Sequence, residues 1–100
     1  MNFLSTAFGI NERVSVTEKA LLNLINNAVS EIKGIKLANV PRITFLPDQS
    51  NATFIIDVKI KKNYSLKTTI EGLREEITKN FETLLDFKPH NIRICFVEFY

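Results

Sequence analysis

The sequence predicts an α+β protein, a two-layer sandwich in which two helices pack on one face of a small mixed or antiparallel sheet. Two stretches, after Thr17 and after Ser65, carry apolar residues every three or four positions, as amphipathic helices do. Residues 52–61 alternate apolar and polar side chains, as a half-buried strand does. The predicted order is strand, helix, strand, strand, helix, strand, which is typical of a split β-α-β unit.

Length and composition define one domain. A chain of 100 residues can bury one compact core but not two. Its hydrophobic content of 45% and charged content of 24% are those of a globular protein. The net charge of +2 is too small to indicate nucleic-acid binding by itself. We assign residues 1–10 to a short N-terminal arm and residues 11–100 to a single α+β domain.

The residue types near the N-terminus predict a short strand followed by the first helix. Residues 13–16 alternate and predict a short strand, with Val14 and Val16 facing inward. The helix that follows starts either at Ser15, through a capping box with Glu18, or at Thr17. The arm carries three apolar side chains that are expected to dock on the domain, Phe3, Leu4 and Phe8.

Turn residues separate the remaining elements. Gly34 ends the first helix, because glycine accepts a left-handed backbone. The extended segment after it contains Pro41, which lacks a ladder donor, so an edge strand or a bulged strand is expected there. The turn cluster at 47–51 predicts a hairpin between 42–46 and the strand that follows. Ser65 caps the second helix, and the last strand covers 91–99.

The last strand is apolar on both faces, whereas two helices can cover only one face of the sheet. In a regular strand Ile92, Ile94 and Phe96 point one way, and the residues between them point the other way. The uncovered face is therefore predicted to bind a partner or a second copy, unless the N-terminal arm folds over it. The residues of this candidate interaction face are Ile55, Lys59, Lys61, Cys95, Val97 and Phe99.

No constellation of residues predicts catalysis, a metal site or a cofactor site. His90 and Cys95 are the one pair that could form a nucleophilic dyad, but they lie five residues apart near one strand, roughly 16 Å along it. One histidine and one cysteine do not supply a zinc site, and the three glycines form no phosphate-binding loop. We expect a protein that is not an enzyme, needs no cofactor and has no small-molecule substrate.

The cellular location is predicted from the cysteine count, the lengths of the apolar runs and the N-terminal sequence. The single cysteine, Cys95, excludes an internal disulfide and favours a reducing, cytoplasmic compartment. No apolar run approaches the ~18 residues that span a bilayer, and the N-terminus does not resemble a secretion signal. A cytoplasmic protein without a transmembrane segment is expected.

The segment "KIKKNYSLK", residues 59–67, raises the question of an anionic ligand. Alternation assigns Ile60 to the core and places Lys59 and Lys61 together on the open face of the sheet. Those two lysines either keep a strand end solvated or face an acidic partner or an anionic membrane. The segment "CFVEF" at 95–99 also overlaps the tail of an RNA-binding strand motif, without the glycine of that motif.

The order of segments resembles the alkaline shock protein family, the small envelope stress response proteins of Gram-positive bacteria and mollicutes. The resemblance covers about residues 12–99 and rests on "EIKGI", which contains Gly34 and Ile35, on Tyr64 before the second helix, and on the apolar pattern of the last strand. Ser65 and Asp86–Phe87 depart from the family pattern. The resemblance implies a cytoplasmic, non-enzymatic protein of cell-envelope homeostasis that self-associates and binds a membrane-anchored protein. A KH-like RNA- or ribosome-associated factor is the alternative.

Overall fold

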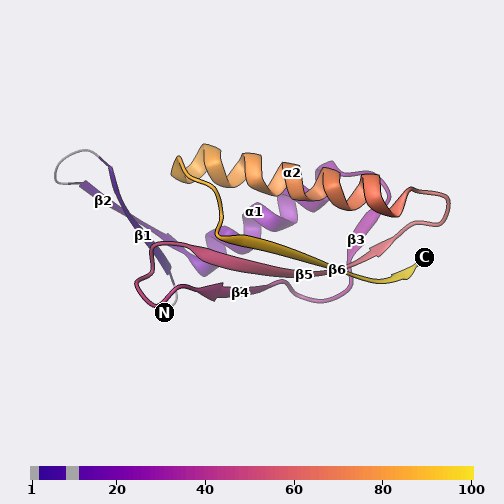
Figure 1. Ribbon diagram of the computed structural model, residues 1–100, viewed down its shortest axis with the longest axis horizontal. Helices are drawn as coiled ribbons and strands as arrows, with labels where there is room; N and C mark the ends of the chain where they lie inside the picture. The colour runs from indigo at the N-terminus through magenta and orange to yellow at the C-terminus, as the bar shows by residue number, and fades with distance from the viewer. Residues whose placement is uncertain (1–2, 9–11) are drawn as a thin grey trace.

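The computed structural model describes residues 3–8 and 12–100, with side chains described from Val16 onward. Its helices lie on the same side of a four-stranded sheet, so the predicted two-layer α+β fold is confirmed (Figure 1). A separate two-stranded hairpin precedes this layer pair. In chain order the elements are β1 (Phe3–Phe8), β2 (Glu12–Thr17), α1 (Glu18–Glu31), β3 (Ile35–Leu37), β4 (Arg42–Phe45), β5 (Ala52–Ile60), α2 (Leu66–Leu85) and β6 (Asn91–Phe99).

Strand β5 is the centre of the sheet. Both β3 and β4 pair with it in antiparallel fashion, β3 through Ile35 opposite Ile60 and β4 through Arg42 opposite Ile55. Strand β6 pairs with β5 in parallel along nearly its whole length, so β3 and β4 share the other edge of β5. The sheet is therefore mixed, and the chain leaves the ladder between β3 and β4, as Pro41 predicts.

The core lies between the sheet and the two helices. The β5 side chains that point to the helices are fully buried, and Phe54 meets Phe81 of α2 edge-on with 5.7 Å between ring centroids. Each helix starts at a capping hydroxyl: Thr17 Oγ1 accepts from the Ala20 amide and Ser65 Oγ from the Thr68 amide, both at 3.2 Å. The buried residues of the helices are Leu21, Leu24, Ile25, Ala28, Thr69, Leu73, Ile77, Phe81 and Leu85.

The N-terminal segment forms a strand that pairs with β2. The register joins Leu4 to Val16 and Phe8 to Glu12, and Figure 1 shows the hairpin projecting past one end of the sheet. The segment predicted as the first strand, 13–16, is thus paired with β1 and not with the four-stranded sheet. The predicted docking of Phe3, Leu4 and Phe8, and the inward position of Val14, lie outside the described side chains.

A β-bulge divides β6 into two parts. Phe96 pairs with Val58, but the next pairs are Glu98 with Lys59 and Phe99 with Ile60. Val97 is therefore the extra residue, and every side chain after it points to the opposite face from the one that a regular strand would give it. The prediction that Phe99 shares a face with Cys95 is wrong for this reason. Phe99 lies on the helix side, 4.8 Å from Phe96 between ring centroids.

Candidate interaction surface

The face of the sheet that points away from the helices, called the open face here, is built in rows of paired residues. One row contains Arg42, Ile55 and Arg93, which face one another across β4, β5 and β6. Another contains Lys36, Lys59 and Glu98 across β3, β5 and β6. Residues that pair directly across a sheet present their side chains on the same side. The open face is therefore mainly charged and polar: Lys59 lies on it as predicted, whereas fewer apolar side chains lie on it than the sequence predicts.

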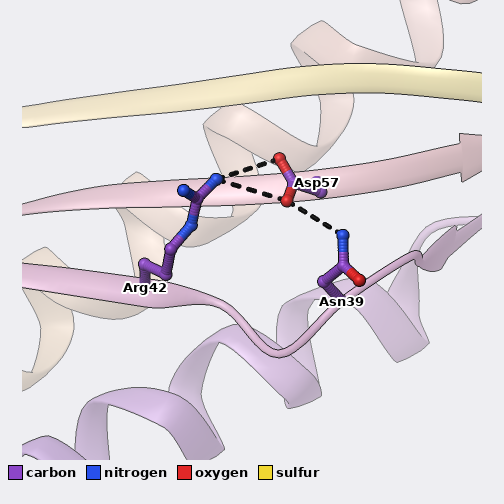
Figure 2. A network of polar contacts seen from close by, with 3 residues as sticks. All are labelled: Asn39, Arg42 and Asp57. Atoms are coloured by element: carbon purple, nitrogen blue, oxygen red, sulfur yellow. Dashed lines mark hydrogen bonds and ion pairs between the residues drawn. The ribbon is translucent and has the colours of Figure 1, made fainter.

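The carboxylate of Asp57 accepts hydrogen bonds from two other side chains, those of Arg42 and Asn39. Arg42 Nη2 donates to Asp57 Oδ2 at 3.2 Å and to Oδ1 at 3.3 Å, and Asn39 Nδ2 donates to Oδ2 at 3.1 Å (Figure 2). The Asp57 side chain is 17% exposed and that of Arg42 is 62% exposed. These bonds connect the interrupted edge, where the chain passes from β3 to β4, to the central strand.

Two further contacts hold the end of the open face near the C-terminus. Lys59 Nζ lies 3.0 Å from Glu98 Oε1. Lys36 Nζ lies 4.2 Å from the centroid of the Tyr100 ring, within the range of a cation–π contact. Tyr100 itself is fixed beside β5, because its amide donates to the Ile60 carbonyl at 3.0 Å and its carbonyl accepts from the Lys62 amide at 2.9 Å.

Charge is distributed unequally between the two layers. The open face carries five basic and two acidic residues, a surplus of three positive charges. The two helices carry four basic and six acidic residues, a surplus of two negative charges. The protein is therefore positive on its sheet side although its net charge is only +2. The open-face charges are Lys36, Arg42, Lys59, Lys61 and Arg93 against Asp57 and Glu98.

Exposed apolar side chains gather at the C-terminal end of β6. Phe96 is 37% exposed, Val97 50% and Phe99 45%. Among the described residues, β6 pairs only with β5, so its outer edge has no strand partner. The guanidinium of Arg74 on α2 donates to the Ile92 carbonyl near the start of β6. We call Phe96, Val97 and Phe99 the β6 patch.

The six residues predicted as one interaction face are thus divided. Ile55, Lys59 and Cys95 lie on the open face, where Cys95 is exposed and pairs with Asp57. Lys61 continues this face just beyond β5, with its amide bonded to the Gly34 carbonyl at 2.8 Å. Val97 is the bulge residue and Phe99 points to the helix side. The structure therefore offers two surfaces, the charged open face and the β6 patch.

Sequence reasoning missed the basic residues on the neighbouring strands. Arg93 alternates with Ile92 and Ile94, and this alternation is sufficient to place it on the face away from the core. Lys36 and Arg42 alternate with apolar neighbours in the same way, but in strands of only three and four residues, and their place beside Lys59 and Ile55 depends on the register with β5. Tyr100 follows the bulge, so its face depends on a feature that the sequence does not mark.

Among the described residues, no group of three or more histidine, cysteine or acidic side chains lies close enough together to hold a metal ion. His90 lies just before β6, where its amide donates to the Ala52 carbonyl at 3.2 Å and to Asn51 Oδ1 at 3.0 Å. From residues 3–8 and 12–100, no helix emerges that is both long and apolar enough to cross a bilayer.

The fold and its surfaces define a small α+β protein with two uncovered regions on the sheet layer. No family model, curated protein or solved structure matches the chain.

Proposed function

We propose that this protein is a non-enzymatic interaction module of the alkaline shock type, which self-associates through the β6 patch. The observation that carries the proposal is the group of exposed apolar side chains, Phe96, Val97 and Phe99, beside a strand edge that has no partner among the described residues. Uncovered apolar side chains that gather at one place are typical of a protein interface. Burial of such side chains contributes about 25 cal/mol per Å² of apolar surface.

Side chains rather than a continued backbone ladder would make this interface. The bulge at Val97 disrupts the regular pattern of outward amides and carbonyls, and Arg74 occupies the Ile92 carbonyl. Both features are known means by which proteins prevent edge strands from pairing without limit. The expected result is a reversible assembly of discrete size through the β6 patch.

Cytoplasmic location, cell-envelope homeostasis and a membrane-anchored protein partner belong to the same proposal. They rest on the resemblance in the order of elements and in two positions, Gly34 and Tyr64. Those two positions contact each other in the fold, since the Tyr64 ring fills the space beside Gly34. This contact gives a structural reason why glycine and tyrosine would occur together at these two positions, and so supports the resemblance.

Sedimentation velocity over a range of protein concentrations tests self-association. The wild-type protein is expected to show a rising mean mass, and Val97→Glu is expected to raise the dissociation constant at least tenfold, about 1.4 kcal/mol. Leu84→Glu is the matched control, because Leu84 is 47% exposed on α2, away from β6. Circular dichroism verifies that both variants fold. A wild-type protein that stays monomeric, or an equal effect of the two variants, would contradict the proposal.

Microscopy of a fluorescent fusion tests the cellular part of the proposal. The fusion is expected at the cell periphery, and Val97→Glu is expected to alter that distribution only if assembly is needed for recruitment. A wild-type fusion spread evenly through the cytoplasm would remove the membrane-anchored partner from the proposal, while leaving self-association in place.

A further inference from the structure

The open face carries five basic residues and only two acidic ones. Arg42 forms an ion pair with Asp57, and Lys59 forms one with Glu98, so both acidic residues of this face are already paired. Among the described residues, Lys36, Lys61 and Arg93 form no ion pair. Such a surplus attracts an anionic partner, since unpaired cations on one surface raise the local potential.

The spacing of all five basic residues of the open face, paired and unpaired, indicates the shape of the anion. Arg42 and Arg93 face each other across Ile55, so their backbones are roughly 9–10 Å apart, two strand spacings. Lys59 and Lys61 are two residues apart along the chain, about 7 Å. The backbone positions of the basic residues are therefore spread along and across the strands of the open face. This spacing suits an extended polymer with repeated negative charges better than a single small anion.

The remaining side chains of the open face distinguish between polymers. A membrane surface needs basic and apolar groups on the same side of the protein, but Phe96 and Phe99 point to the helix side. The carboxylates of an acidic peptide can pair with the basic residues, but acidic side chains carry no aromatic ring to stack on guanidinium planes or on the Tyr100 ring. Nucleic-acid bases do stack on such groups, while hydroxyl and amide side chains bond to their edges. Further donors of this kind on the open face are Thr44, Thr53 and Asn91.

We propose that the open face binds single-stranded nucleic acid, with Lys36, Lys61 and Arg93 at the phosphates and with Ile55, Arg42 and Tyr100 beneath the bases. This inference is independent of self-association, because Phe96 and Phe99 of the β6 patch point to the helix side, away from the open face. The proposal does not use the RNA-binding strand motif that "CFVEF" partly matches, because Phe96 and Phe99 of that segment do not lie on the open face.

Fluorescence anisotropy tests the proposal with a labelled single-stranded RNA of about 12 nucleotides. Binding is expected to weaken steeply as KCl rises from about 50 to about 300 mM, with a slope of about −0.7 in log–log form for each phosphate contacted. The double variant Lys61→Glu, Arg93→Glu is expected to lose at least tenfold in affinity and about 1.4 units of slope.

The matched control reverses two lysines of the helix layer, Lys67→Glu and Lys79→Glu, which changes the net charge by the same amount. Its affinity for RNA is expected to fall less than threefold. Equal losses in the two double variants would overturn the proposal, as would a wild-type protein that does not bind RNA at about 50 mM KCl. Wild-type binding to anionic phospholipid vesicles or to polyglutamate, but not to RNA, would also overturn it. Val97→Glu is expected to bind RNA normally, which separates this result from the assembly test.

Discussion

The ring of Tyr64 occupies the space that a side chain on Gly34 would need. A Cβ built on Gly34 would lie 2.6 Å from Tyr64 Cγ and 2.7 Å from Cε2. The backbone of Gly34 is left-handed, with φ of 80°. The turn after α1 is thus packed against the turn before α2, and the Lys61 amide bonds to the Gly34 carbonyl at 2.8 Å. Position 34 therefore requires glycine for two reasons: the left-handed backbone conformation, and the space that the Tyr64 ring occupies.

Gly34→Ala is therefore expected to destabilise the protein strongly. The left-handed backbone costs about 1–2 kcal/mol for a residue with a Cβ, and the displaced ring adds to that. We expect a loss of about 2–3 kcal/mol in the free energy of unfolding, measured by urea denaturation. The melting temperature should fall by about 8 °C or more.

Tyr64→Ala provides the partner variant for a double-mutant cycle. Once the ring is gone, Gly34→Ala should cost about 1 kcal/mol less than it does in the wild-type protein, because only the backbone term remains. If Gly34→Ala costs the same with and without the ring, the packing of Tyr64 on Gly34 is not what restricts this position.

The features that the sequence predicts correctly are those with a local signal. The alternation of β5, the capping residue Ser65 and the interruption at Pro41 are each readable within a few residues. The sequence leaves the start of α1 open between Ser15 and Thr17, and the structure selects Thr17. The bulge at Val97 has no such signal, because β6 is apolar on both faces and contains no glycine at that point. One extra residue then reverses the face of Phe99 and of Tyr100.

The pairing of charges on the open face could not be predicted from any one strand. Asp57 and Arg42 are 15 residues apart, and only the register of β4 against β5 brings them together. The first strand, Phe3–Phe8, was also missed, because "FLSTAF" does not alternate between apolar and charged residues. Register and long-range pairing decide these features, and both depend on the whole fold.

Asp57→Ala and Arg42→Ala are expected to differ in their cost. Asp57 is mostly buried and accepts from both Arg42 and Asn39, so its removal should cost about 1–2 kcal/mol. Arg42 is 62% exposed and screened by solvent, so its removal should cost less than about 1 kcal/mol. Urea denaturation of both variants measures the difference. A larger cost for Arg42→Ala would mean that the guanidinium packs on the sheet rather than serving mainly the ion pair.

Asp86→Gly is expected to stabilise the protein. Asp86 ends α2 with a left-handed backbone, φ of 64°, and its amide bonds to the Glu82 carbonyl at 2.8 Å. Glycine removes the strain of that conformation and also removes a negative charge from the negative end of the helix. We expect a gain of about 0.5–1 kcal/mol, or about 2–8 °C in melting temperature.

Asp86→Asn separates the two contributions to this gain. Asparagine removes the charge but keeps a side chain on the left-handed backbone, so it should stabilise less than glycine. A loss of stability in both variants would show that the Asp86 carboxylate has a favourable partner in solution.

Ser50 is expected to control the titration of Asp48 in the turn between β4 and β5. The Ser50 hydroxyl and amide both donate to Asp48 Oδ1, at 2.7 and 3.0 Å, and they lower the pKa of Asp48 below its ordinary value of 3.8. A carboxyl whose pKa is lowered on folding stabilises the fold above its ordinary pKa, and this contribution is lost as the pH falls through the lowered value. Ser50→Ala removes the hydroxyl, which is the larger cause, so the pKa of Asp48 should rise toward 3.8.

Carboxyl-detected NMR titration of Asp48 measures this pKa directly, and thermal unfolding between about pH 2 and 7 measures its effect on stability. The stability difference between wild type and Ser50→Ala should be greatest at neutral pH and should shrink as Asp48 becomes protonated. In the Asp48→Asn background, Ser50→Ala should have no pH-dependent effect, because no carboxyl remains to titrate at that position. An unchanged pKa of Asp48 in Ser50→Ala would show that the Ser50 hydroxyl does not donate a hydrogen bond to the Asp48 carboxylate in solution.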